Sequence, residues 1–367
     1  MTYFLGVDLH KTQFTVHERT EQKTDKEIVQ YPTDEGGYTL FLKRIKNLRT
    51  RGHEVKVGVE STGNTRYFKN KVEQAGGEVT VINTLKFKVI NESTKKTDKH
   101  DAATISEFLS KDMLPESHLC SKETENIRRL LKSRERLVRS IVGQKNEVHA
   151  LLVSTGLQDD LRSIQSKKGR QKVLDTLSSH SDLVLEAQSV KLIFEIIGKL
   201  EESVKLVEKQ LHELLDGDEM IERLLTIRGC GPVTAWTIRA YTEDIGRFAN
   251  AKKYAAFCGL VPWVQDSNKS VHHGKITKRG PQELRTAFVQ LVFGIRRCGD
   301  TSTWRLMQRY EHMKKNKGSG KSIVATARKM AEIVWYLLTD KVDFDCRKME
   351  GKYTPLPVSL AEQATSA

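Results

Sequence analysis

The chain opens with an apolar run that a single acidic residue interrupts, Tyr3-Phe4-Leu5-Gly6-Val7-Asp8-Leu9. Its composition favours a β-strand, and a second strand-like run follows at Phe14–Arg19, so we expect a hairpin that turns at Lys11-Thr12. Burying a carboxylate inside an apolar strand is costly unless it is paired or binds a cation. Asp8 is therefore the first candidate functional residue.

The rest of the first hundred residues alternates strand and helix patterns. Strands are expected at Ile28–Tyr31, Val55–Val59 and Val79–Ile82, and helices at Tyr38–Leu48, Asn64–Gln74 and about Asp98 to Ser110. The resulting order, three strands and then helix, strand, helix, strand and helix, predicts a mixed sheet with helices on its faces. It is the order of the ribonuclease H-like fold.

Three further acidic residues stand at the ends of these elements. Glu60 ends the strand pattern Val57-Gly58-Val59, and Asp98 and Asp101 point to one face of the first turn of their helix. With Asp8 they could converge as oxygen ligands of Mg²⁺ or Mn²⁺, which would assist phosphoryl transfer. The alternative is that Asp98 and Asp101 only stabilise a helix N-terminus and that Glu60 is a surface carboxylate.

The sequence pattern predicts long helices for the middle of the chain. Glu123–Ser154 contains one glycine and no proline, and a heptad pattern follows after a polar stretch. The heptad positions are Val190, Ile193, Ile197, Leu200, Val204, Val207, Leu211 and Leu214. Such a seam indicates either a coiled coil between chains or a helix packed within its own chain.

The length of 367 residues suggests two or three domains. We expect an α/β domain over 1–157, a coiled-coil helical region over 158–218, a mostly helical domain over 219–340 and a loosely held tail over 341–367. The fold class is thus α/β followed by all-α.

The charge distribution points to nucleic acid. The net charge is +14, and residues 261–330 hold fifteen Lys or Arg but only four acidic residues. Positive charge at this density attracts a polyanion by releasing its counterions. A basic surface kept for solubility is the alternative, but aromatic residues interleave with the cations, namely Trp263, Phe288, Phe293, Trp304 and Tyr310.

Several classes of protein are disfavoured. The longest apolar stretches fall far short of the ~20 residues that cross a bilayer, so no membrane partner is expected. The N-terminus lacks the pattern of a signal peptide. Five scattered cysteines without close pairs disfavour a disulfide scaffold or a zinc ribbon and indicate a reducing cytoplasm.

The C-terminal part carries two motifs. Arg228-Gly229-Cys230-Gly231-Pro232 lies between two helical patterns, and such a glycine hairpin can turn its N–H groups toward a DNA phosphate; a simple corner between helices is the alternative. Ser267, in a polar loop near Lys and Arg, could attack a phosphate. From the residues alone, a structural loop serine is the more ordinary interpretation.

Three blocks resemble the signature of the DEDD transposases of bacterial insertion sequences, a family that includes pilin-gene invertases and bridge-RNA-guided recombinases. The blocks are Gly6–Lys11, Val59–Gly63 and Asp98–Ala102, and the segments Gly259–Arg285 and Lys317–Lys321 are similar to the family's C-terminal domain. At position 268 this chain has an asparagine, whereas a glycine is common at that position in the family. The resemblance extends to about residue 340.

The resemblance implies a site-specific DNA recombinase with a RuvC-like domain. Asp8, Glu60, Asp98 and Asp101 match the family's metal-binding tetrad, and Ser267, with Ser270 as competitor, matches the serine that attacks DNA and forms a phosphoserine link before strand exchange. It also implies donor and target DNA, a guide RNA, and a homo-oligomer (dimer or tetramer) that shares its active sites, at work in the bacterial cytoplasm and nucleoid.

The expected nucleic-acid-binding residues are Arg228, Gly229, Gly231, Lys275, Lys278, Arg279, Arg285, Lys317 and Lys321. Two alternatives stay open. One is a RuvC-like, metal-dependent junction nuclease that uses water, with Ser267 structural. The other is a non-enzymatic nucleic-acid scaffold with a degenerate nuclease domain, which the four intact acidic residues disfavour.

Overall fold

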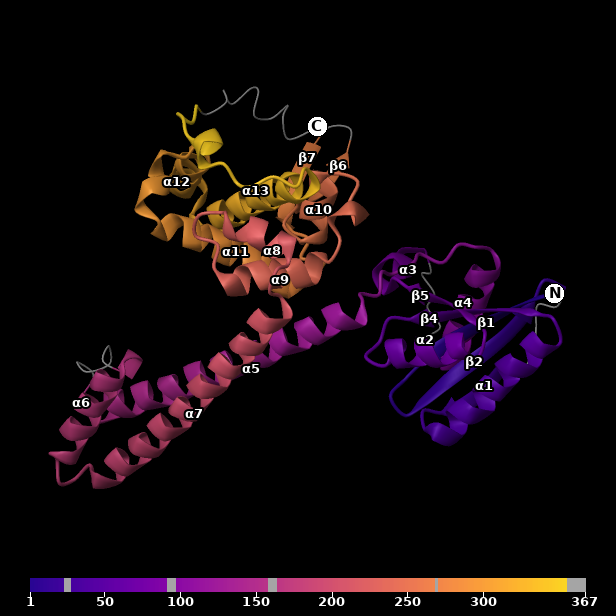
Figure 1. Cartoon of the computed structure of the whole chain (residues 1–367), viewed down its shortest axis with the longest axis horizontal. Coiled ribbons are helices and arrows are strands. Elements are labelled where there is room, and N and C mark those ends of the chain that lie inside the picture. The colour runs from indigo at the N-terminus through magenta and orange to yellow at the C-terminus, as the bar shows by residue number, and fades with distance from the viewer. Residues whose placement is uncertain (23–27, 91–96, 158–163, 268–269, 355–367) are drawn as a thin grey trace. The chain divides into compact units, whose positions relative to one another are not determined.

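The computed structural model describes residues 1–22, 28–90, 97–157, 164–267 and 270–354. For residues 89–90, 264–267 and 270–273 it describes the backbone alone. The chain separates into two compact units, Met1–Cys120 and Ser121–Ala367, whose elements are labelled in Figure 1.

The first unit is built on a five-stranded sheet in the order β3-β2-β1-β4-β5. β1 (Thr2–Leu9), β2 (Gln13–Thr20) and β3 (Ile28–Pro32) form an antiparallel meander, whereas β4 (Glu54–Glu60) and β5 (Glu78–Ile82) continue the sheet parallel to β1. A parallel neighbour needs a crossover connection, and helices supply it here. The predicted mixed sheet and its N-terminal hairpin are confirmed.

Helices cover both faces of this sheet. α1 (Glu35–Thr50) and α2 (Thr65–Gln74) bury Phe41 and Phe68 against Phe14 of β2, in a cluster of aromatic rings. α3 (Thr84–Ile90) follows β5, and α4 (Asp98–Ser110) packs on β1, β2 and β4. Since successive strand residues face opposite sides, Gly6 and Asp8 share the face that α4 covers.

Two glycines let α4 lie very close to the sheet. Gly6 and Gly58 are register partners on β1 and β4. A Cβ atom on Gly6 would lie 2.0 Å from the Ala102 carbonyl oxygen and 2.4 Å from the Ser106 nitrogen, and one on Gly58 would lie 2.8 Å from the Ile105 side chain. Any side chain at Gly6 would therefore push the α4 backbone away from the strand.

The second unit begins with a long helical hairpin. α5 (Lys122–Ser154) and α7 (Val184–Leu214) lie side by side, and α6 (Lys167–Ser178) packs near their far end (Figure 1). α6 shows that the polar stretch before the heptad region contains a regular helix.

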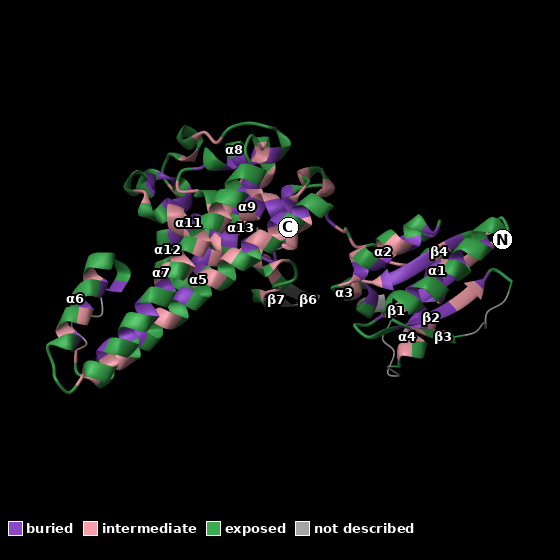
Figure 2. Cartoon of the chain, turned by 60° about the horizontal axis from the view of Figure 1, so that its bottom comes forward, coloured by how far each residue is buried: buried purple, intermediate pink, exposed green. Residues whose placement is uncertain are grey.

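The predicted coiled-coil region needs correction. Val190, Ile193 and Ile197 of the heptad seam are buried in a core of this chain, which α5 and α6 complete with Ile141, Val148, Leu152, Val173 and Leu177. Leu211 is also buried, whereas Leu214, the last of the eight seam positions, is 53% exposed. Figure 2 shows the buried residues along the facing sides of the two long helices. The seam thus packs within the chain, and it no longer supports association between chains.

The remaining elements form a helical domain around one apolar core. They are α8 (Glu219–Leu225), α9 (Pro232–Thr242), α10 (Ala251–Phe257), α11 (Gln282–Arg297), α12 (Arg305–Lys317) and α13 (Ser319–Thr339), with three short 3₁₀ helices. A two-stranded hairpin, β6 (Pro262–Ser267) and β7 (Ser270–Ile276), occupies the position where the sequence predicted only a polar loop around Ser267. Among the described helices, none is both long and apolar enough to span a bilayer.

Two boundaries differ from the sequence prediction. The first compact unit ends at Cys120, whereas the predicted first domain extends to 157, because α5 packs along α7 within the second unit. The segment after 341 is anchored at least to Tyr353: the Phe344 amide donates to Thr226, and the Tyr353 amide donates to Gln308. The Phe344 ring also contacts Trp304.

The close approach at Gly6 predicts that Gly6→Ala destabilises the first unit. Overpacking a core costs about 1–3 kcal/mol, and here the obstacle is backbone, so we expect the upper end. All four tryptophans lie in the second unit. Urea unfolding followed by far-UV circular dichroism should therefore shift, while the tryptophan fluorescence transition should not.

Gly63→Ala is the matched control, because a Cβ atom there would meet no atom within 4 Å. It should change stability by less than about 0.5 kcal/mol. Equal unfolding curves for the two variants would mean that α4 tolerates a methyl group at Gly6.

Candidate metal centre and nucleic-acid surface

Two of the predicted acidic residues lie at neighbouring strand ends. β1 and β4 are parallel and pair up to Val7 and Val59, so Asp8 and Glu60 are the next residues on the two adjacent strands. Both side chains are partly buried, and that of Asp8 is 14% exposed. The carboxyl ends of parallel strands thus bring these two carboxylates to one edge of the sheet.

The other two acidic residues come from the first turn of α4. The Thr97 hydroxyl caps this helix by accepting a hydrogen bond from the His100 amide, and Asp98 and Asp101 follow in its first turn. Because α4 lies directly on Gly6 and Gly58, its N-terminal turn is held near the ends of β1 and β4. Local capping and the two glycines therefore position the predicted pair.

The electrostatics show that the four carboxylates act on one another. Burial raises the pKa of the Asp8 carboxyl; His10 opposes this shift, while the charges of Asp98 and Asp101 add to it. Burial also raises the pKa of Glu60, and the charges of Asp8 and Asp101 contribute. Asp8 and Glu60 therefore resist ionisation, and a bound cation would favour their charged forms. The structure thus brings the four predicted residues into one electrostatic cluster.

A histidine that the sequence reasoning did not assign also faces this cluster. His10 Nε2 lies 3.0 Å from Asp8 Oδ2 and 3.7 Å from Asp98 Oδ1. One ligand atom each of Asp8, His10 and Asp98 lies within 4.8 Å of the others. The sequence did contain a signal for this contact: His10 is two residues after Asp8, and alternate residues of an extended chain share a face.

This donor set fits a divalent cation. Carboxylate oxygens are the ligands that Mg²⁺ and Mn²⁺ prefer, and an imidazole nitrogen is accepted by Mn²⁺. Among the described residues, Asp8, His10 and Asp98 have ligand atoms close enough together to hold one ion, and Glu60 and Asp101 add negative charge that acts on Asp8.

The predicted nucleophile belongs to the second unit. Ser267 is the last residue of β6 and pairs through its backbone with Ser270, the first residue of β7. The side chains of both serines lie outside the described residues, as does the whole of Asn268.

The predicted glycine hairpin joins two helices as expected. α8 ends at Leu225, Gly231 precedes α9 as its N-cap, and Pro232 is the first helical residue. Gly229 has a φ of +85° and packs on Gly294 of α11, where a Cβ atom would lie 2.5 Å from the backbone. The turn therefore requires a glycine at 229.

The predicted cations are spread along the loops of this unit. Lys275, Lys278, Arg279, Lys317 and Lys321 are exposed. Arg228 forms an ion pair with Asp300 at 2.7 Å, and Arg285 Nη1 donates to the Lys278 carbonyl oxygen at 3.4 Å. The exposed cations are thus available to a polyanion, whereas Arg228 has to exchange one carboxylate partner for a phosphate.

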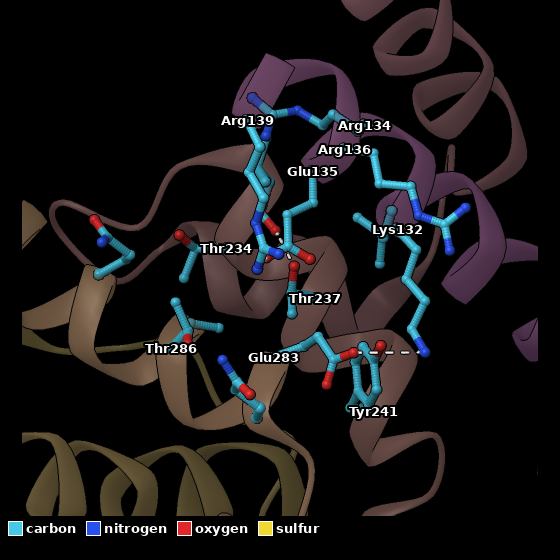
Figure 3. A pocket seen from close by; sticks show the side chains of 15 residues that line it. Lys132, Arg134, Glu135, Arg136, Arg139, Thr234, Thr237, Tyr241, Glu283 and Thr286 are labelled. Atoms are coloured by element: carbon cyan, nitrogen blue, oxygen red, sulfur yellow. Dashed lines mark hydrogen bonds and ion pairs between the residues drawn. The ribbon is translucent and has the colours of Figure 1, made fainter. Parts of the chain in front are cut away.

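A polar pocket of about 430 Å³ lies between α5, α9 and α11 (Figure 3). Lys132, Arg134, Arg136 and Arg139 line it from α5. Lys132 pairs with Glu283, Arg139 with Glu135 and Arg134 with Glu208, while no ion pair of Arg136 occurs among the described residues. Sequence reasoning used this stretch only for its helical periodicity and missed the pocket.

Two family models match the chain. Residues 5–157 match the IS110-type DEDD transposase model, described as "Transposase", and residues 221–311 match the model "Transposase IS116/IS110/IS902 family". Together the two matches take up about two thirds of the chain. The first match contains all four acidic residues, and the second contains the glycine hairpin, Ser267 and the β6–β7 cations.

Curated relatives agree with these models over nearly the full length. The chain is 27% identical to a "Probable family 20 transposase" of Pseudomonas aeruginosa, covering 91% of this chain and 96% of the relative. It is 27% identical to the "Transposase for insertion sequence element IS1111A" of Coxiella burnetii, with coverages of 85% and 87%. It is 26% identical to the IS1328 transposase of Yersinia enterocolitica, with coverages of 93% and 98%. The chain belongs to the IS110/IS116 family of transposases, enzymes that act on DNA.

Proposed function

We propose that the first unit cuts a DNA phosphodiester bond with the help of a divalent metal ion during transposition of an insertion sequence. The observation that carries this proposal is the electrostatic cluster of Asp8, Glu60, Asp98 and Asp101. Burial and the nearby acidic charges raise the proton affinity of Asp8 and Glu60, and a cation would offset that cost. The family match to a DEDD transposase model supports the same assignment.

The roles of the chain's own residues follow from their positions. Asp8 and Glu60 are held by adjacent strands, so the spacing of their oxygens is fixed by the sheet. Asp98 and Asp101 enter from α4 and close the cluster from a second direction. A bound Mg²⁺ or Mn²⁺ supplies charge stabilisation for the attacking and leaving oxygens.

The second unit would hold the DNA backbone. Of the exposed cations, Lys275 lies near the end of β7, Lys278 and Arg279 follow that strand, and Lys317 and Lys321 flank the turn between α12 and α13. Phosphate contacts of this kind fix the position of a duplex without reading its sequence. The pocket between α5, α9 and α11 is a second candidate phosphate site in this unit, because its solvent-facing ion pairs are weak and a phosphate can replace a carboxylate.

Two nucleophiles are compatible with this centre. Water needs only the residues of the first unit, as in a RuvC-like nuclease, and the acid cluster supports this version most directly. Ser267 is the nucleophile that the family resemblance implies; its hydroxyl would form a phosphoserine bond to DNA as the oxygen of the broken phosphodiester leaves. A guide RNA and a homo-oligomer belong to this second version, and both are proposals that rest on the resemblance.

Removing the metal should separate cleavage from binding. With a chelator, or in the variant Asp8→Asn, cleavage of DNA that carries the element's ends should fall at least about 100-fold, because a catalytic metal contributes several kcal/mol. DNA binding, measured by fluorescence anisotropy, should change less than about threefold, because the cations that bind phosphate lie in the second unit. Equal loss of cleavage and binding would refute this division of labour.

The variant Ser267→Ala decides between the two nucleophiles, with Ser270→Ala as its matched control in the same hairpin. If Ser267 attacks, only Ser267→Ala loses both strand cleavage and the protein–DNA adduct that survives denaturing electrophoresis. If water attacks, both variants cleave and the wild type forms no adduct. An adduct that disappears in Ser270→Ala alone would assign the attack to Ser270.

The cations after β7 should contribute to the salt dependence of DNA binding. In the triple variant Lys275→Ala, Lys278→Ala, Arg279→Ala, the slope of log Kobs against log salt should decrease by about one for each phosphate that the protein no longer neutralises. The control removes the same charge from exposed lysines of α7, Lys191, Lys199 and Lys209, and should leave the slope unchanged. Equal slopes for the two triple variants would mean that the β7 cations do not bind DNA.

A further inference from the structure

His10 faces the acid cluster from the end of β1. Its side chain is 50% exposed, and its Nε2 atom lies 3.0 Å from Asp8 Oδ2 and 3.7 Å from Asp98 Oδ1. It follows β1 directly, where the backbone amide of His10 donates to the Gln13 carbonyl oxygen at 3.0 Å and the His10 carbonyl oxygen accepts from Thr33 and Asn64. Three hydrogen bonds thus fix the backbone at His10, and its ring lies beside Asp8 and Asp98.

The spacing of the three ligand atoms suits one metal ion. Octahedral bonds of about 2.1 Å place neighbouring ligand atoms about 3 Å apart and opposite ones about 4.2 Å apart. The His10–Asp8 and His10–Asp98 distances lie within this range, and the atoms of all three residues lie within 4.8 Å of one another. An ion could therefore take up His10 Nε2 together with one oxygen of each aspartate with little movement of the side chains.

An imidazole changes which metal such a site prefers. Mg²⁺ takes almost only oxygen ligands and gives up its waters reluctantly, whereas Mn²⁺, although it binds nitrogen more weakly than the later transition metals, accepts an imidazole more readily than Mg²⁺ does. We propose that His10 is a nitrogen ligand of the metal centre and that it gives the site a preference for Mn²⁺ over Mg²⁺. This inference rests on the proposed metal-dependent function and goes beyond it by naming a further ligand and a selectivity.

The competing explanation is that His10 only hydrogen-bonds to Asp8. A half-exposed His–Asp pair of this kind contributes little to stability on its own. The two explanations differ in what a metal does to the pair. As a ligand, His10 Nε2 bonds to the metal; as a hydrogen-bond partner, it touches only the carboxylate.

Mn²⁺ itself is the probe, added to the metal-free full-length protein without DNA. Electron spin echo measurements should show the modulation of a directly bound ¹⁴N nucleus in the wild type and not in His10→Ala. Titration followed by the signal of free Mn²⁺ should show a loss of Mn²⁺ affinity of about tenfold or more in His10→Ala, the size expected when an interaction that supports a metal ligand is removed. Calorimetric Mg²⁺ affinity should change less than about threefold.

His53→Ala is the matched control, since His53 precedes the opposite end of β4 and its ring contacts Tyr3. It should keep the ¹⁴N signal and both affinities. If the wild type binds Mn²⁺ in a way that Asp8→Asn abolishes, yet shows no ¹⁴N modulation and no change in His10→Ala, the role of His10 is refuted and the metal centre stands. If Asp8→Asn binds Mn²⁺ as the wild type does, the metal centre itself fails, and the role of His10 fails with it.

Discussion

The burial of two carboxylates, Asp8 and Glu60, at one edge of a sheet, beside further negative charge, is the constraint around which the first unit is arranged. Asp8 and Glu60 are brought together by the parallel pairing of β1 and β4, and α4 adds two more negative charges in its first turn. Burial, with smaller contributions from the neighbouring acidic charges, raises the pKa values of Asp8 and Glu60, so keeping both ionised without a cation costs free energy. Packing elsewhere in the unit holds the elements that carry these charges in place and stabilises the fold despite that cost.

The packing that fixes them is at Gly6 and Gly58. These glycines lie side by side on adjacent strands and leave no room between β1 and the α4 backbone. On the other face, α1 and α2 bury the aromatic cluster around Phe14. Helices thus pack on both faces of the sheet, so the strand ends that carry Asp8 and Glu60 cannot easily move apart. A rigid, charged edge of this kind is suited to binding a metal ion in a defined geometry.

The second unit differs from the first, because it carries many positive charges on a stable helical framework. Its helices share one large apolar core, and the hairpin of α5 and α7 continues that core outward through Leu211 and Ile127. The cations lie on exposed loops and helix ends, where they stay solvated until a polyanion binds. Core and charged surface are therefore separate, so a change in the cations need not disturb the fold.

Local sequence patterns missed α3, but they predicted the strands of the first unit, its helices α1, α2 and α4 and the glycine hairpin at 229, and they singled out the four acidic residues. Each depends on features within a few residues, such as alternation, a helix cap or a required positive φ. The heptad seam on α7 shows the limit of such patterns, because an apolar stripe has the same spacing whether its partner is another chain or α5. The tail after 341 shows it too, since Phe344 and Tyr353 are held by residues far away in the sequence.

The amino-acid sequence by itself determined which residues carry charge, which carry apolar side chains and where helices and strands begin. Only the tertiary structure decided that α5 packs on α7, that His10 faces Asp8 and Asp98, and that a pocket lies between α5, α9 and α11. The physical reason is that these features are contacts between segments far apart along the chain. Such contacts are selected by the packing of whole surfaces, and no local pattern specifies them.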